Sequence, residues 1–266
     1  ILVVPARAQF ALSPEQEAWV EQTLAQMPLR EKIGQVLFAA APSAFTNQES
    51  ESFREIRENI QNYHVGGYHF WGGDPVAAYL LISRMQELAR IPLLITADFE
   101  GGTGFQLRGG TRFPRAMAIG ATGNPQYAYD AGKFTALEAR AMGFGVNFYP
   151  VVDVNNNPGN PIINIRSFGE SPQTVAAMGA AYVKGTQEAG VIATAKHFPG
   201  HGDTSVDSHL ELPVLGFDRA RLERIELPPF AAAIQAGAGA VMTAHIHLPQ
   251  FEKTPGLPAS LSAAVS

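Results

Sequence analysis

The 266-residue chain contains no cysteine. This absence excludes a disulfide-stapled scaffold, a thiol nucleophile and a metal held by thiolates within the chain. Charged residues are also scarce, at 16%, and the formal net charge is -5. A general nucleic-acid-binding protein normally carries a basic face, so we expect no nucleic-acid partner. No apolar run approaches the roughly 18–20 residues that a helix needs to cross a bilayer, so we expect no membrane span.

The chain begins without a methionine, at an apolar run over residues 1–4 that is followed by Ala6 and Ala8. This pattern resembles the tail of a signal peptide with a small-x-small cleavage site, and an arbitrary start is the alternative. We therefore interpret residues 1–12 as a signal-peptide remnant or N-terminal tail. The remnant would favour an exported, periplasmic protein over a cytoplasmic one.

Short apolar runs alternate with helical stretches along residues 13–266, and hydrophobic residues make up 46% of the chain. The apolar runs are nearly continuous, as is typical of parallel strands that are covered on both faces. They lie at residues 33–41, 65–71, 92–97, 146–154, 191–197 and 240–246. The helical stretches lie at residues 14–27, 47–62, 75–90, 125–142, 172–189 and 219–236. This alternation predicts an α/β fold.

Polar and glycine-rich clusters follow successive predicted strands, at residues 66–67, 98–102, 153–157, 196–209 and 245–247. A TIM-like (β/α) barrel predicts this pattern, because its active site is assembled from the C-terminal ends of its strands. A dinucleotide-binding fold has less support, since no Gly-x-Gly-x-x-Gly turn or phosphate loop follows the first strand. We count six of the eight strands of a barrel. We therefore expect a C-terminally incomplete catalytic domain and a further barrel segment of the same protein as its partner.

The densest polar cluster, at residues 196–209, contains one lysine, three histidines and two aspartates. Lys196 and His197 directly follow a strand core, at the expected barrel mouth, where a cation and an imidazole suit an oxygen-rich ligand. Asp207 and His209 are two positions apart and can both turn to one side of an extended loop. A carboxylate that holds an imidazole raises its basicity, which suits proton transfer near neutral pH.

His201 and Asp203 lie in the same cluster, beside Pro199, Gly200 and Gly202. These three residues are typical of a tight turn. Two interpretations stay open for His201 and Asp203: they take part in the site, or they only bond the backbone of this turn.

The run Lys-His-Phe-Pro-Gly-His-Gly-Asp-Thr that begins at Lys196, with the Asp-Ser-His triplet after it, resembles the signature of the β-N-acetylglucosaminidase branch of glycoside hydrolase family 3. The resemblance implies that His209 is the general acid/base and that Asp207 orients it. It also implies that Lys196 and His197 bind the sugar that is cleaved off.

Two further segments resemble the same family. Asp98 begins an Asp-x-Glu-Gly-Gly segment, whose aspartate binds sugar hydroxyls, and a lone carboxylate at a strand end suits a diol. Arg166 begins an Arg-Ser-Phe-Gly segment, whose arginine contacts the sugar; a surface salt bridge is the alternative. Arg108 is another sugar-binding candidate, although it lies further from the Glu-Gly-Gly than the family's arginine does. We expect Glu100 and Asp153 to fix loops rather than to touch substrate.

The resemblance implies a retaining exo-β-N-acetylglucosaminidase that removes non-reducing-end N-acetylglucosamine from peptidoglycan fragments or chito-oligosaccharides. Such an enzyme needs no cofactor and no metal. Its nucleophile is an aspartate just after the seventh strand, and we find no seventh strand. We therefore expect the nucleophile beyond the end of the chain, and the 266 residues alone to be inactive.

Four alternatives remain open. The chain could act as a phosphorylase or a β-glucosidase of the same family, or it could be an inactive fragment. A metal-dependent barrel hydrolase would instead use His197, His201, His209 and His245 as ligands. Against that alternative, the resemblance places His245 in a Met-x-x-His segment at the end of the sixth strand.

Overall fold

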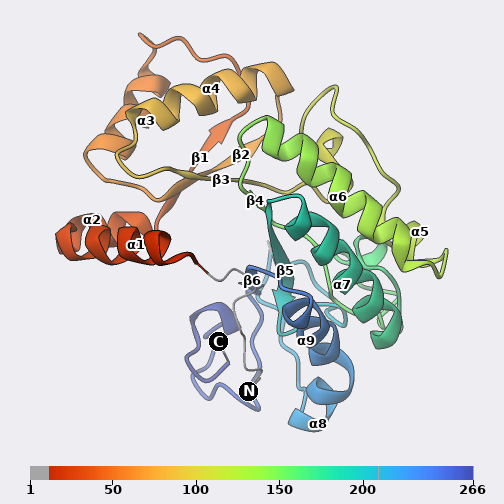
Figure 1. Cartoon of the computed structure of the whole chain (residues 1–266). Coiled ribbons are helices and arrows are strands. Elements are labelled where there is room, and N and C mark those ends of the chain that lie inside the picture. The colour runs from red at the N-terminus through yellow and green to blue at the C-terminus, as the bar shows by residue number, and fades with distance from the viewer. Residues whose placement is uncertain (1–11, 209, 266) are drawn as a thin grey trace.

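The computed structural model describes residues 12–208 and 210–265 (Figure 1). The expected N-terminal tail lies outside the described residues except for Leu12, and His209 lies outside them as well. Within the described part of the chain, no helix combines the length and the apolar character needed to traverse a lipid bilayer.

Two helices precede the sheet, α1 (Pro14–Gln26) and α2 (Leu29–Gln35). Ser13 starts α1 with a capping box: its hydroxyl accepts the N–H of Gln16, and the Gln16 side chain accepts the N–H of Ser13. Each of these bonds satisfies a backbone donor that a helix start otherwise leaves open. The predicted helix at residues 14–27 is therefore confirmed to within one residue.

Six parallel strands form one sheet in chain order, each pairing with the next. They are β1 (Phe38–Pro42), β2 (Gly67–Trp71), β3 (Leu94–Ala97), β4 (Val146–Asn147), β5 (Ile192–Phe198) and β6 (Ala240–Thr243). The longer helices are α3 (Glu51–Gln61), α4 (Pro75–Leu88), α6 (Pro125–Ala141), α7 (Pro172–Glu188) and α9 (Leu227–Gln235). The predicted α/β fold with six parallel strands is confirmed.

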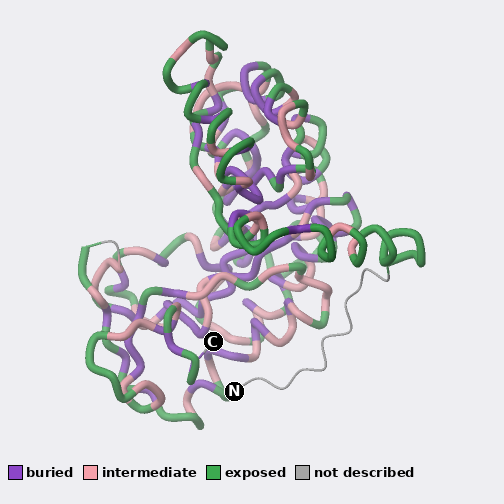
Figure 2. The backbone as a smooth tube through the Cα atoms, turned by 90° about the vertical axis from the view of Figure 1, so that its left-hand side faces the viewer, coloured by how far each residue is buried: buried purple, intermediate pink, exposed green. Residues whose placement is uncertain are grey.

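Helices α3, α4, α6, α7 and α9 cover the outer face of the curved sheet. In Figure 1, α3 and α4 lie over β1 to β3, and α6, α7 and α9 follow one another along β4 to β6. Helix α7 packs against both α6 and α9. In Figure 2 the buried residues gather in the interior of the molecule, and the exposed ones lie along its outer loops and helix turns. Two large apolar clusters fill this space, one centred on Phe70 and Ile95 and the other on Val151 and Tyr182.

Two predicted strands are shorter than expected. The apolar run at 33–41 is split, because α2 continues to Gln35 and β1 begins only at Phe38. The run at 146–154 pairs regularly only over Val146–Asn147. Pro150 interrupts it, since a proline has no N–H to donate to a sheet. Pairing resumes at a single bridge between Val151 and Lys196.

The helix predicted at 219–236 is divided into three pieces. They are α8 (Arg219–Arg221), a π-helical turn η3 (Leu222–Glu226) and α9. Pro228 and Pro229 cannot donate to the preceding turn, and their rings would clash with its carbonyl groups in a regular α-helix. The wider π turn accommodates them. The remaining short elements are α5 (Ala116–Gly120), η1 (Thr103–Phe105), η2 (Asn164–Arg166) and η4 (Ala259–Leu261).

Candidate active site

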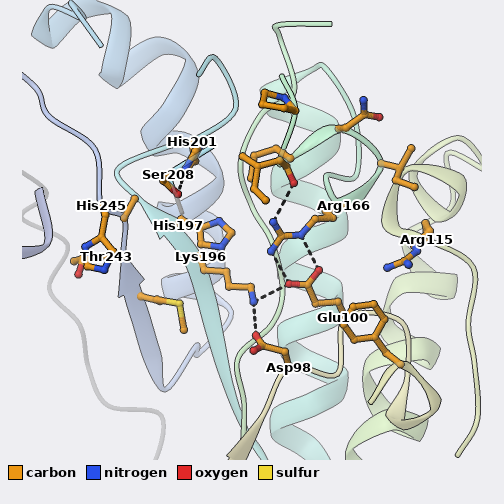
Figure 3. Close-up of a pocket in the computed structure, with 18 of the residues that line it drawn as sticks. Asp98, Glu100, Arg115, Arg166, Lys196, His197, His201, Ser208, Thr243 and His245 are labelled. Carbon is orange, nitrogen blue, oxygen red and sulfur yellow. Dashed lines mark hydrogen bonds and ion pairs between the residues drawn. The ribbon is translucent and has the colours of Figure 1, made fainter. Parts of the chain in front are cut away.

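A pocket of about 840 Å³ opens where β3, β4, β5 and β6 end (Figure 3). Asp98 and Glu100 reach it from the segment after β3, and Arg166 reaches it from η2. Lys196 and His197 reach it from the end of β5. These side chains come from segments far apart in sequence and meet at the carboxyl ends of the strands, where barrel enzymes build their sites.

A chain of alternating charges occupies the centre of the pocket (Figure 3). Lys196 Nζ lies 2.6 Å from Asp98 Oδ1 and 2.8 Å from Glu100 Oε1. Arg166 grips Glu100 with two hydrogen bonds, of 2.8 Å from Nε and 2.7 Å from Nη2. Lys196 is only 3% exposed. Two cations thus balance two carboxylates, which removes most of the cost of burying charge.

The two carboxyl groups stay ionised. Burial raises the pKa of Asp98, but the hydrogen bond from His69 and the charge of Lys196 outweigh it, so this pKa lies well below its usual value. Burial also raises the pKa of Glu100, whereas Arg166 and Lys196 lower it to about 2. Charged donors and acceptors make stronger hydrogen bonds than neutral ones, so this pocket is suited to a ligand rich in hydroxyl groups.

His197 is held by Asp153. Its Nδ1 lies 2.7 Å from Asp153 Oδ2, and its backbone N–H donates to the same carboxylate. Burial lowers the pKa of His197, and the nearby Asp153 charge raises it less, so the imidazole is neutral. The fully buried Asp153 has a lowered pKa and can only accept, so Nδ1 carries the proton. His197 Nε2 is therefore a hydrogen-bond acceptor.

Asp153 bonds a loop, whereas Glu100 lines the pocket, and the sequence did not indicate this difference. We expected both to fix loops, and Asp153 does, since it also accepts the backbone N–H of His201 over 2.7 Å. Glu100 instead lines the pocket and bonds two of its cations.

Arg108, another sugar-binding candidate, is not among the described residues that line the pocket. Among the described residues that line the pocket, the arginines are Arg166 and Arg115, whereas Arg108 is exposed outside it. Arg115 stacks its guanidinium 4.9 Å from the ring centre of Phe105, at the wall opposite His201 (Figure 3). Arg115 is thus a pocket residue that the sequence pattern did not indicate.

The loop after β5 carries the expected proton-transfer pair. Asp207 is half-buried, and its carbonyl oxygen accepts the N–H groups of Leu210 and Glu211. Asp207 is not among the described residues that line the pocket, whereas the adjacent Ser208 is. The side chain of His201 lines the pocket and bonds the side chains of Thr204 and Ser208 rather than backbone atoms of the turn.

Histidines do not gather around a possible metal in the described part of the chain, and no three His, Asp or Glu side chains there form such a group. His245 lines the pocket and bonds Ser260 Oγ over 2.6 Å. His247 bonds the carbonyl oxygen of Leu257. His69 is a pocket neighbour that the sequence did not indicate; its Nε2 lies 3.4 Å from Asp98 Oδ2.

Comparison with known proteins gives one family over nearly the whole chain. The model of the glycosyl hydrolase family 3 N-terminal domain matches residues 28–265. A beta-hexosaminidase A of Pseudoalteromonas piscicida is 40% identical over 214 residues, which cover 75% of this chain and 36% of that protein.

Solved structures of related enzymes also superpose on this chain. A glycoside hydrolase family 3 beta-N-acetylglucosaminidase from Paenibacillus sp. str. FPU-7 superposes with a TM-score of 0.82 at 41% identity, covering 90% of this chain and 46% of that one. The beta-glucoside phosphorylase BglX gives a TM-score of 0.85 at 28% identity, over 96% of this chain and 45% of its own. The chain thus spans less than half the length of each of these three relatives. The predicted TIM-like barrel arrangement is confirmed by these superpositions.

Proposed function

The chain belongs to glycosyl hydrolase family 3, through the N-terminal domain of that family, and we propose that it forms the sugar-binding part of a retaining exo-β-N-acetylglucosaminidase. One observation carries the proposal: Asp98, Arg166, Lys196 and His197, the residues that the family pattern assigns to sugar binding, line a single pocket. The family relationship to hexosaminidases supports the N-acetylglucosamine specificity.

The binding step follows from the charges of the pocket. The ionised Asp98 accepts hydrogen bonds from two neighbouring sugar hydroxyls, while Lys196 and Arg166 donate to ring substituents. His197 Nε2 accepts a further hydroxyl proton. Because each of these groups is fixed by its own partner in the protein, the sugar is held in one orientation over the carboxyl ends of the strands.

The reaction is a double displacement with retention at the anomeric carbon. His209, oriented by Asp207, protonates the glycosidic oxygen while an aspartate attacks the anomeric carbon. His209 then takes a proton from water, and the water breaks the glycosyl–enzyme bond. The substrates are peptidoglycan fragments or chito-oligosaccharides with N-acetylglucosamine at the non-reducing end.

The attacking aspartate belongs to a further barrel segment of the same protein. Two observations support this part of the proposal. The relatives are more than twice as long as the stretch that this chain matches. Within the described residues, β1 and β6 also pair with one neighbouring strand each, which leaves two sheet edges that a closed barrel would not have.

Hydrolysis of an aryl N-acetyl-β-glucosaminide by the full-length protein tests the proposal. Asp98→Asn should raise KM strongly, whereas Asp130→Asn on the outer helix α6 should leave the kinetics unchanged. Residues 1–266 purified alone should show no turnover. Turnover by these residues alone, blocked by His209→Ala, would mean that the nucleophile lies within them. Preference for a β-glucoside over the N-acetyl substrate would overturn the specificity.

A phosphorylase is the second candidate, because the chain superposes on a beta-glucoside phosphorylase at 28% identity. A histidine acid/base also repels an incoming phosphate less than a carboxylate would. Product analysis with and without inorganic phosphate separates the two. A sugar 1-phosphate that appears only with phosphate indicates the phosphorylase, and free N-acetylglucosamine in both conditions indicates the hydrolase.

A further inference from the structure

His201 is a buried polar residue to which the proposed chemistry assigns no role. It lies in the turn after β5, lines the pocket and is 2% exposed. Its Nδ1 lies 2.7 Å from Thr204 Oγ1, and its Nε2 lies 2.9 Å from Ser208 Oγ. Its backbone N–H donates to Asp153 over 2.7 Å. Each polar atom of this side chain therefore has a partner, which is more than a turn requires.

The hydrogen-bond network assigns the direction of these bonds. Thr204 Oγ1 donates its own proton to the carbonyl oxygen of His201, over 3.1 Å. It must therefore accept from His201 Nδ1, which carries a proton. In a neutral imidazole that carries its proton on Nδ1, Nε2 is the acceptor, and the Ser208 hydroxyl then donates to it.

The bond from Ser208 to His201 Nε2 links His201 to the proposed proton-transfer pair. Ser208 stands between Asp207 and His209, the two residues of the proposed proton-transfer pair. The bond between His201 and Ser208 therefore connects two parts of the loop after β5 (Figure 3). One part carries the proposed proton-transfer pair, and the other is the buried turn at residues 200–204.

The turn at residues 200–204 is held by hydrogen bonds from two asparagine side chains. The Asn160 side chain donates to the carbonyl oxygens of His201 and Gly202, over 2.9 and 3.0 Å. The Asn157 side chain donates to the carbonyl oxygens of Asp203 and Thr204. Ser208 is thus bonded to a turn that cannot shift without breaking several other hydrogen bonds.

We propose that His201 is a positioning residue, which fixes the segment that carries the proton-transfer pair through its hydrogen bond to Ser208. The proposal rests on the function proposed above. It assigns no proton transfer to His201 itself, because both ring nitrogens are engaged within the protein.

Ser208→Ala tests the proposal with the least disturbance, because Ser208 is only half-buried. Ser205→Ala is the matched control, since Ser205 lies in the same loop and is exposed. We compare kcat/KM of the full-length protein on a chito-oligosaccharide, whose leaving group needs protonation, and on a dinitrophenyl glycoside, whose leaving group does not. One lost hydrogen bond of ordinary strength corresponds to about a 3- to 10-fold change.

We expect Ser208→Ala to lower kcat/KM by about that factor on the chito-oligosaccharide only, and Ser205→Ala to change neither substrate. Equal losses on both substrates would mean a merely structural bond and would overturn the proposal, as would an unchanged Ser208→Ala. An inactive wild-type protein would overturn the proposed function and this inference with it. An active wild-type protein with an unaffected Ser208→Ala would overturn the inference alone.

A pair of substitutions at His201 separates its two bonds. A glutamine places its amide near the position of Nε2 and can still bond Ser208, whereas an asparagine reaches only the position of Nδ1. We expect His201→Gln to keep more of the kcat/KM on the chito-oligosaccharide than His201→Asn does, at similar thermal stability. The reverse order would contradict a role through Ser208.

Discussion

Lys196 at the end of β5 donates a 2.6 Å hydrogen bond to Asp98, which follows β3 and lies 98 positions earlier in the chain. The same ammonium group reaches Glu100 over 2.8 Å. Lys196 is far in sequence from Asp98 and Glu100, and the parallel sheet brings the three charged groups within hydrogen-bond distance. Since Lys196 is almost fully buried, the two carboxylates offset part of the cost of burying its charge.

Lys196→Met should therefore destabilise the protein. It leaves Asp98 and Glu100 with Arg166 as their principal remaining cation, and removing one partner of a buried ion pair costs about 3–5 kcal/mol. The unfolding free energy in urea measures this loss. Lys184→Met is the control, because Lys184 makes only an exposed ion pair with Glu188 on α7, worth about 0–1 kcal/mol. Equal losses for the two variants would contradict the central role of Lys196.

His209→Ala tests the acid/base assignment. Removing a general acid lowers the rate by roughly 10²–10⁴ when the leaving group needs its proton. We expect a loss of that size in kcat/KM on chito-oligosaccharides and a much smaller loss on a dinitrophenyl glycoside. Similar losses on both substrates would argue that His209 serves binding or folding instead.

Gly202→Ala tests how closely the loop after β5 packs on its neighbour. A Cβ at this position would lie 1.7 Å from the carbonyl oxygen of Val154, so one of the two backbones must move. We expect a lower thermal unfolding midpoint and a loss of kcat/KM, because the displaced loop carries Asp207. Gly216→Ala, where a Cβ meets no atom within 4 Å, should change neither. A stable, fully active Gly202→Ala would mean that the loop tolerates this shift.

Much of the fold could be predicted from the sequence, because each strand and helix is encoded locally. The near-continuous apolar runs predicted the six strands, and the stretches between them predicted most of the helices. One strand and one helix differ from the prediction because of prolines, which a pattern of apolar residues does not take into account. Pro150 ends regular pairing after β4, and the two prolines after Leu227 convert one predicted helix into three pieces.

The site could be predicted only in part. Asp98, Arg166, Lys196 and His197 were found because polar residues stand directly at strand ends or in distinctive motifs, and all four line the pocket. Their roles in binding stay predictions. The partnership of Glu100 with two cations depends on the sheet bringing distant segments together, and no local pattern encodes it.

His69 escaped notice for a different reason. It stands inside an apolar strand, where a lone histidine usually only fills the core. Its inward position beside Asp98 follows from the alternation of β2, which becomes informative once the neighbouring strand is known. The position of Arg115 in the pocket likewise depends on the path of the loop after β3, which no local pattern encodes.

The last prediction concerns Glu226, a carboxyl group that is 1% exposed in the π turn η3. Burial raises its pKa to about 7, although Arg221 and Asn156 act in the opposite direction. Arg221 Nη2 lies 3.3 Å from Glu226 Oε1 and 3.0 Å from Asp203 Oδ2, so it is shared between two acids. Glu226 Oε2 has no hydrogen-bond partner within the described residues, which agrees with a group that favours its proton.

A raised carboxyl pKa makes the folded protein hold a proton that the unfolded chain has lost. The contribution of Glu226 to stability is therefore full below its ordinary pKa of 4.5 and is lost as the pH rises to about 7. With 1.4 kcal/mol for each pKa unit, the loss amounts to about 3 kcal/mol.

Glu226→Gln removes this titration and keeps a side chain of the same shape. Urea unfolding at several pH values between 4.5 and 7.5 measures the difference, because other titrating groups contribute equally to both proteins. We expect the stability of wild type relative to Glu226→Gln to fall by about 3 kcal/mol across that range. Glu223→Gln is the control: Glu223 is exposed in the same turn, and its substitution should leave the pH profile parallel to that of wild type. Parallel profiles for wild type and Glu226→Gln would mean that Glu226 titrates as it would in water, and that the buried network around Arg221 keeps it ionised.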